Sequence, residues 1–281
     1  MKLHILHQTF YRYAGAVNGN ANELRLTPKT SLWQKPQFFL LRVLPSTRLR
    51  RFQDLHGNHV TYFEVEESHS SLSIEATCTV TTQDRYSDGL PAAISLAELE
   101  NPQQMESVEP FLQPTSLVDI CPEIWRAAVD IRAEETSVFG LARSLMRYVY
   151  ESCKYESGVT DVHTTASEFW TDRRGVCQDF AHLYLALCRS VQLPARYVSG
   201  YLYDSRRTEI RGAHATHAWA EVWLPGIGWH GMDPTNDSLT HENYVVLAAG
   251  RDYHDVPPVK GSFWGPSERE MQVLVHIEER P

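Results

Sequence analysis

The decisive stretch of this sequence reads Arg173-Arg174-Gly175-Val176-Cys177-Gln178-Asp179-Phe180. Gly175 lets the backbone turn sharply just before a helix that we expect to begin near Cys177. A cysteine in that first turn lies beside free backbone N–H groups and the positive end of the helix dipole, which stabilise its thiolate. The thiolate is the nucleophilic form, and the same N–H groups can stabilise an oxyanion. Taken alone, Cys177 fits equally well as a small buried residue at the start of a core helix.

Apolar residues at helical spacing occur both before and after this stretch. Apolar residues repeat at helical spacing over 180–191, and Leu193-Pro194 ends that helix. Cys188 lies on the apolar stripe, so we expect it to be an inert core residue. A second helix is predicted over 138–149, with Thr136-Ser137 as its cap.

A strand carrying a histidine follows at 216–224. Side chains alternate between the two faces of a strand, so His217, Trp219 and Glu221 share one face. On that aromatic face His217 could act as a base beside a thiolate. A lone histidine of this kind is more often a hydrogen-bonded residue of the sheet.

Asp233 lies on the next strand, after a turn at 225–228, and the two strands are predicted to form a hairpin. If Leu224 pairs with Trp229, His217 and Asp233 lie on opposite faces. If Trp223 pairs with Trp229, Asp233 is a diagonal neighbour of His217, close enough for a hydrogen bond that orients the imidazole. A lone Asp-Pro pair is otherwise most simply a turn starter.

Cys177, His217 and Asp233 together form the pattern of a nucleophile, a base and an orienting carboxylate. A weaker interpretation is a metal hydrolase using His214 and His217. Two histidines three residues apart on a strand point to opposite faces, and no third ligand lies nearby in the sequence, so no metal or cofactor is predicted.

The rest of the chain divides into three parts. Residues 1–85 read as short alternating strands separated by turns, with turns placed at Gly15 and at Asn18-Gly19-Asn20 among others. This pattern predicts an antiparallel sandwich-like or barrel-like domain. Residues 86–118 read as a connector with one short helix near 94–99. Residues 119–281 form the predicted α+β core, which includes a final strand near 271–277. The first part carries no catalytic grouping, and we expect it to shape substrate access or to support dimerisation.

Several motifs, taken together, resemble the transglutaminase-like core of cysteine enzymes. The motifs are Arg174-Gly175-Val176-Cys177, residues 193–201, residues 217–222, Gly228-Trp229, and Asp233-Pro234-Thr235-Asn236. Residues 1–85 resemble the β-rich region that accompanies this core in bacterial proteins. The resemblance implies a papain-like α+β fold in which Cys177 is the nucleophile, His217 the base and Asp233 the orienting residue. It also implies attack on a carboxamide or peptide carbonyl, with transfer of the acyl group to water or an amine.

The resemblance leaves more than one function open. Some family members cross-link glutamine to lysine with calcium, but the sequence has no acidic loop of the EF-hand kind. We therefore expect a protease or amidase acting on a peptide or protein substrate rather than a cross-linking enzyme. The alternative is a non-catalytic binding module that keeps the fold as a scaffold. Tyr201 could line the cleft or be an ordinary aromatic residue of the sheet.

Composition argues against some classes of partner, and the N-terminal residues favour one compartment. The 281 residues have 26 Lys+Arg and 35 Asp+Glu, a net charge of -9, and 42% apolar residues. This acidic balance argues against nucleic acid and anionic membranes as partners. The first thirteen residues read as a strand and not as a signal peptide, which favours the cytoplasm. Five cysteines without a CxxC pair do not resemble a disulfide framework. The sequence does not predict an oligomeric state.

Overall fold

The computed structural model describes residues 1–280 except 101–105, 206–208 and 212–215. His214 lies outside the described residues, so the interpretation that pairs it with His217 receives no structural account.

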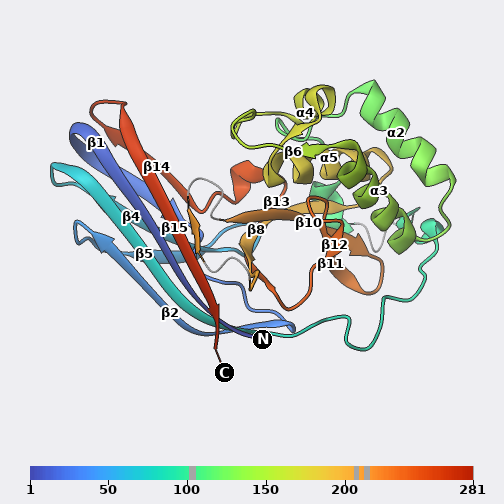
Figure 1. Cartoon of the computed structure of the whole chain (residues 1–281), viewed down its shortest axis with the longest axis horizontal. Helices are drawn as coiled ribbons and strands as arrows, with labels where there is room; N and C mark the ends of the chain where they lie inside the picture. The colour runs from blue at the N-terminus through green and yellow to red at the C-terminus, as the bar shows by residue number, and fades with distance from the viewer. Residues whose placement is uncertain (101–105, 206–208, 212–215, 281) are drawn as a thin grey trace.

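Three layers make up the molecule (Figure 1). Helices lie on one side, a five-stranded antiparallel sheet lies in the middle, and an eight-stranded antiparallel sheet lies on the other side. The helices are η1 (Leu96–Glu100), η2 (Glu106–Phe111), α2 (Pro122–Ala133), α3 (Val138–Ser152), α4 (Ala166–Asp172), α5 (Cys177–Ser190) and η3 (Tyr253–Asp255). This arrangement confirms the predicted α+β class and the two helices expected over 138–149 and from Cys177.

The middle sheet has the strand order β12-β11-β10-β8-β13. Its strands are β8 (Ala195–Leu202), β10 (His217–Leu224), β11 (Gly228–Asp233), β12 (Ser238–Leu239) and β13 (Tyr244–Gly250). One face of β10 carries Ala218, Ala220 and Val222, which pack into the core shared with α5. The opposite face carries Trp219, which packs against Tyr244. The alternation predicted for 217–224 is therefore confirmed.

The outer sheet has the order β2-β5-β1-β15-β9, with β14, β4 and β3 attached through β1. Its strands are β1 (Lys2–Leu24), β2 (Gln34–Leu44), β3 (Arg50–Gln53), β4 (His59–Val65), β5 (His69–Thr82), β9 (Glu209–Arg211), β14 (Val259–Trp264) and β15 (Arg269–Glu279). A further pair, β6 (Lys154–Tyr155) and β7 (Arg174–Gly175), is parallel and lies beside the start of α5.

The long strand β1 differs from the sequence interpretation, which placed turns at Gly15 and at 18–20. In the structure β1 runs through both positions, and its register with its neighbours shifts there. Gly19 has φ 54°, which a residue without a side chain adopts freely. These residues therefore form irregularities at which β1 changes partners, from β5 and β15 to β4 and β14.

The C-terminal strands also lie outside the part of the fold expected for them. The sequence interpretation placed the last strand within the 119–281 core, whereas β15 pairs with β1 along residues 3–13. The two chain ends consequently lie near each other in Figure 1. This pairing makes the C-terminal segment a strand of the outer sheet, where it contributes to the site described below.

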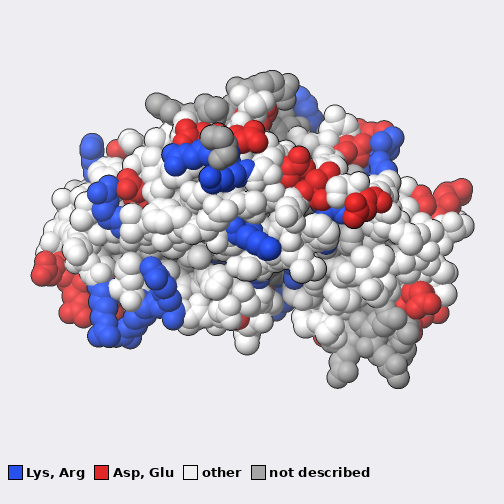
Figure 2. All heavy atoms as spheres, turned by 90° about the horizontal axis from the view of Figure 1, so that it is seen from below, with Lys and Arg blue, Asp and Glu red and all other residues white. Residues whose placement is uncertain are grey.

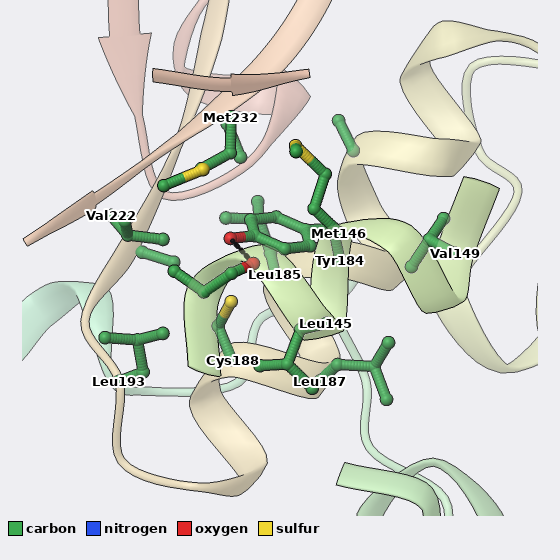
Figure 3. Packing of buried hydrophobic residues seen from close by; sticks show 14 of the residues in the cluster. Leu145, Met146, Val149, Tyr184, Leu185, Leu187, Cys188, Leu193, Val222 and Met232 are labelled. Carbon is green, nitrogen blue, oxygen red and sulfur yellow. Dashed lines mark hydrogen bonds between the residues drawn. The ribbon is translucent and has the colours of Figure 1, made fainter. Parts of the chain in front are cut away.

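The core beneath the helices holds α5 in place (Figure 3). The labelled side chains come from α3, α5, the turn after α5 and the middle sheet: Leu145, Met146, Val149, Tyr184, Leu185, Leu187, Cys188, Leu193, Val222 and Met232. The Tyr184 hydroxyl donates to the Ala142 carbonyl at 3.0 Å, which joins α5 to α3. Cys188 is fully buried, and burial raises its pKa to about 12, as expected of an inert core cysteine.

Acidic and basic side chains are interspersed on the face seen in Figure 2, and uncharged surface separates them. Among the residues that the structure describes, the helices are too short or too polar for any of them to cross a membrane.

Candidate active site

Cys177 is the first residue of α5 and is 6% exposed. The backbone N–H of Val176 donates to Asp179 Oδ2 at 2.7 Å, and the Thr160 hydroxyl donates to the same oxygen at 2.7 Å. These bonds tie the turn before the helix to the loop that contains Thr160. They fix the cysteine at the helix N-terminus, where the dipole favours a thiolate.

Gly175 is required here by close packing, not by an unusual backbone angle. A methyl group at this position would overlap the Asp179 carboxylate and the Phe169 ring. Sequence reasoning assigned Gly175 to a sharp turn. Its role in the structure is to let the Asp179 side chain fold back over the chain before α5.

His217 and Asp233 lie together because of the hairpin register. Trp223 pairs with Trp229, which is the second of the two registers considered from the sequence. Asp233 consequently lies on the same face as His217, and His217 Nε2 lies 2.7 Å from Asp233 Oδ2. Cys177 and His217 line the same pocket, and Cys177 raises the pKa of the His217 imidazole. The structure therefore brings all three predicted residues together.

Asp233 is fully buried and heavily hydrogen-bonded. Besides His217, its Oδ2 accepts from the Tyr244 hydroxyl at 2.8 Å and from Asn236 Nδ2 at 2.7 Å. Its Oδ1 accepts from the Thr235 backbone N–H at 2.9 Å. Burial opposes the charged form, but His217 and these donors outweigh it, and the pKa of Asp233 lies below the usual value. The carboxylate is thus ionised and held in one orientation.

The charge on Asp233 determines that of His217. Burial lowers the pKa of the imidazole, but the adjacent carboxylate and the contact with Cys177 raise it to about 10. The ring is therefore cationic at neutral pH. A cation at this position favours negative charge on a neighbouring group.

Cys177 and His217 open into a pocket of about 370 Å³ between the middle and outer sheets. The core contributes Val176, Gln178, Tyr197, Ser199 and Ala218 to the lining, and the loop before α4 contributes residues 158 and 160–162. The outer sheet contributes His7, Thr9, Tyr11, Val259, Met271 and Val273. The N-terminal region and the last strand therefore form part of the wall around the cysteine.

The other residues weighed from the sequence lie elsewhere. Tyr201 is a buried residue of the sheet whose hydroxyl lies 2.9 Å from His7 Nδ1. His182 is a buried residue of α5, and its Nε2 accepts from the Tyr253 backbone N–H at 3.3 Å. Among the described residues, the only cluster with ligands for a metal ion is Asp84, His241 and Glu242. None of these three lines the pocket of Cys177.

Comparisons with known proteins identify the family to which this chain belongs. A model of the transglutaminase-like superfamily matches residues 126–234, and a model of the bacterial transglutaminase-like N-terminal region matches residues 3–81. An uncharacterized protein from Mycobacterium leprae is 32% identical over 98% of each chain. An uncharacterized protein from Mycobacterium tuberculosis is 36% identical and covers 95% of this chain and 89% of its own. The chain belongs to the transglutaminase-like superfamily.

A solved structure shares the fold of this chain along nearly its full length. A crystal structure described as a "putative cysteine protease" from Cytophaga hutchinsonii superposes with a TM-score of 0.78. It is 23% identical and covers 99% of this chain and 90% of that one, a likeness that shows the fold. The protein-glutamine gamma-glutamyltransferase of Pseudomonas aeruginosa is 29% identical over 101 residues, 34% of this chain and 15% of that protein.

Sequence reasoning missed two features of this transglutaminase-like site. Tyr244 and Asn236 both bind the Asp233 carboxylate. Tyr244 lies in a stretch that has no pattern of its own, and no role was assigned to Asn236. The outer-sheet wall was missed because residues on β1 and β15 become neighbours only through long-range pairing. The Asp233-Pro234-Thr235-Asn236 motif was the available signal for Asn236.

Proposed function

We propose that this protein is a cysteine-dependent enzyme that cleaves or transfers amide bonds of a peptide or protein substrate. Cys177 is the nucleophile, His217 moves the proton, and Asp233 orients and charges His217. The observation that carries the proposal is the chain of contacts from Cys177 through His217 to Asp233 Oδ2, 2.7 Å from the ring. Membership in the transglutaminase-like superfamily supports the same chemistry.

The proposed reaction has two stages. The Cys177 thiolate attacks the substrate carbonyl, and backbone N–H groups at the start of α5 are placed to stabilise the oxyanion. The C–N bond then breaks as the His217 imidazolium gives its proton to the departing ammonia or amine, which leaves a thioester on Cys177. In the second stage, water or an amine loses a proton to His217 and attacks the thioester. The thiolate leaves, and the acid or a new amide is released.

Hydrolysis is the outcome that we propose for the second stage. The pocket meets solvent beside Val162, which is 44% exposed, and Met271, which is 47% exposed. Water therefore has a route to the thioester. The Cytophaga hutchinsonii protein is described as a cysteine protease, which is consistent with a hydrolase, whereas the name of the Pseudomonas aeruginosa relative describes acyl transfer.

A peptide library tests this choice. Glutamine-containing peptides of varied sequence are incubated with the protein, with and without a primary amine, and the products are identified by mass spectrometry. We expect cleaved peptides or conversion of amides to acids, in amounts that the amine changes little. Predominant formation of amine adducts would instead assign the enzyme as a transamidase. No turnover of any peptide, together with reversible peptide binding, would favour the non-catalytic module.

A further inference from the structure

The face of the outer sheet that lies toward the middle sheet is buried packing at one end of β1 and pocket lining farther along. Odd-numbered residues in the first part of β1, over 3–13, are buried against the middle sheet. Leu3 and Ile5 are fully buried in a cluster that also contains Tyr201 and Val245. Farther along the same face, Thr9 and Tyr11 line the pocket of Cys177 instead. The apolar contact between the sheets therefore continues into the pocket as an open wall.

The partner strand β15 continues this wall. Val273 pairs with Thr9, and Met271 pairs with Tyr11, so the four side chains form two adjacent cross-strand pairs. Val259, at the start of β14, lines the same pocket. We call Tyr11, Val259, Met271 and Val273 the apolar wall. Three of them are aliphatic, and the fourth is an aromatic ring.

Charge is absent from the apolar wall. His7, which also lines the pocket, is 2% exposed, and burial lowers its pKa to about 4, so its ring is neutral at neutral pH. The cation near the wall is Arg269, whose guanidinium lies 5.6 Å from the centre of the Tyr11 ring but does not line the pocket. Asp161, in the loop before α4, supplies the only carboxylate among the described lining residues. A carboxylate of the substrate placed against the aliphatic members of the wall would lose its hydration without gaining a partner from the wall.

We propose that the apolar wall selects substrates by binding a bulky apolar side chain next to the reacting carbonyl. This inference rests on the proposed function of Cys177. The volume of about 370 Å³ is near the lower end of ordinary ligand sites, which suits one large aliphatic or aromatic side chain beside the amide. Substrates of this class are peptides or amides with a residue resembling leucine, methionine or phenylalanine at that position.

Alkylation of Cys177 by three matched reagents tests this proposal without a known substrate. The reagents are iodoacetamide, N-benzyl iodoacetamide and N-(4-carboxybenzyl) iodoacetamide. In each case the thiolate displaces iodide to form a C–S bond, so differences in rate report recognition of the substituent. We expect the benzyl reagent to alkylate Cys177 about tenfold faster than iodoacetamide, because its ring is buried against the wall. The carboxybenzyl reagent should lose that advantage.

Two variants of the wall and one control test whether the preference for the benzyl reagent depends on the apolar wall. Val273→Asp places a carboxylate beside Thr9 and should reduce the ratio of benzyl to iodoacetamide rates to about one. Met271→Glu should lower the same ratio, and folding tolerates this variant because Met271 is 47% exposed. Gln272→Asp is the matched control, since Gln272 is an exposed residue on the opposite face of β15. It should keep the wild-type ratio. The ratio cancels any general change in thiol reactivity.

The outcomes separate this inference from the proposed function. If plain iodoacetamide fails to alkylate Cys177, the proposed nucleophile is wrong. If Cys177 reacts readily but shows equal rates with all three reagents, the nucleophile stands and the apolar specificity is overturned. A benzyl preference that survives in both Val273→Asp and Met271→Glu would also overturn the assignment to this wall.

Discussion

Replacing Cys177 by alanine is expected to reduce amide turnover to the background rate, a loss on the order of 10⁶-fold in kcat. The variant lacks the atom that attacks the carbonyl, so no thioester forms. His217 and Asp233 remain but have no nucleophile to serve. Turnover of the best peptide from the library, followed by chromatography, measures the effect.

Cys121→Ala is the matched control for this variant. Cys121 caps the N-terminus of α2 and is partly buried, so it also lies at the positive end of a helix dipole. It does not line the pocket of Cys177. We expect Cys121→Ala to keep wild-type activity. If Cys177→Ala kept more than a small share of the activity while correctly folded, the nucleophile would have to be another residue.

Replacing Asp233 by asparagine is expected to lower kcat/KM by about a thousandfold or more. The amide carries no charge, so the imidazole loses the carboxylate that raises its pKa to about 10. His217 would then be largely neutral at neutral pH and would neither stabilise the thiolate nor donate a proton. Asp84→Asn is the control, because Asp84 and His241 form a second aspartate–histidine pair, 3.0 Å apart and partly exposed. That variant should leave kcat/KM near the wild-type value.

The free energy of unfolding should depend on pH because of the same pair, His217 and Asp233. The folded pKa of His217 lies above its ordinary value of 6.5, so its contribution is complete below pH 6.5 and is lost as the pH rises toward about 10. The pKa of Asp233 is lowered from 3.8, so its contribution is present above that value and is lost in acid. Urea unfolding should therefore show the largest advantage of the wild type over Asp233→Asn between about pH 4 and 6.5. An advantage that grew from pH 7 to 10 would contradict this account.

The local parts of the fold were predictable because their determinants lie close together in the sequence. Ser137 caps α3 through a bond from the Gly140 N–H, and the apolar stripe of α5 identified its buried face. The alternation in 217–224 likewise predicted which side chains of β10 share a face. For the triad, sequence pattern identified the residue types, and membership in the superfamily is consistent with their order.

The remaining features depend on long-range geometry. The turn at 225–228 allowed two registers, and only the pairing of Trp223 with Trp229 places Asp233 beside His217. Tyr244 reaches Asp233 because β13 pairs with β8, which in turn pairs with β10. In the same way, β15 forms part of the pocket because it pairs with β1, more than 250 residues earlier in the chain. No local period encodes such pairings.

The most direct test of the central claim is the order in which the five cysteines react with limiting iodoacetamide at pH 7, followed by peptide mass spectrometry. Burial raises the pKa of Cys78 and Cys188 to about 12, so both should react slowly. The decisive comparison is between Cys177 and Cys121, because both lie at helix N-termini but only Cys177 contacts His217. We predict that Cys177 is labelled first, although it is the more buried of the two, and that Asp233→Asn removes this lead. Earlier labelling of Cys121, with Cys177 inert, would contradict the account.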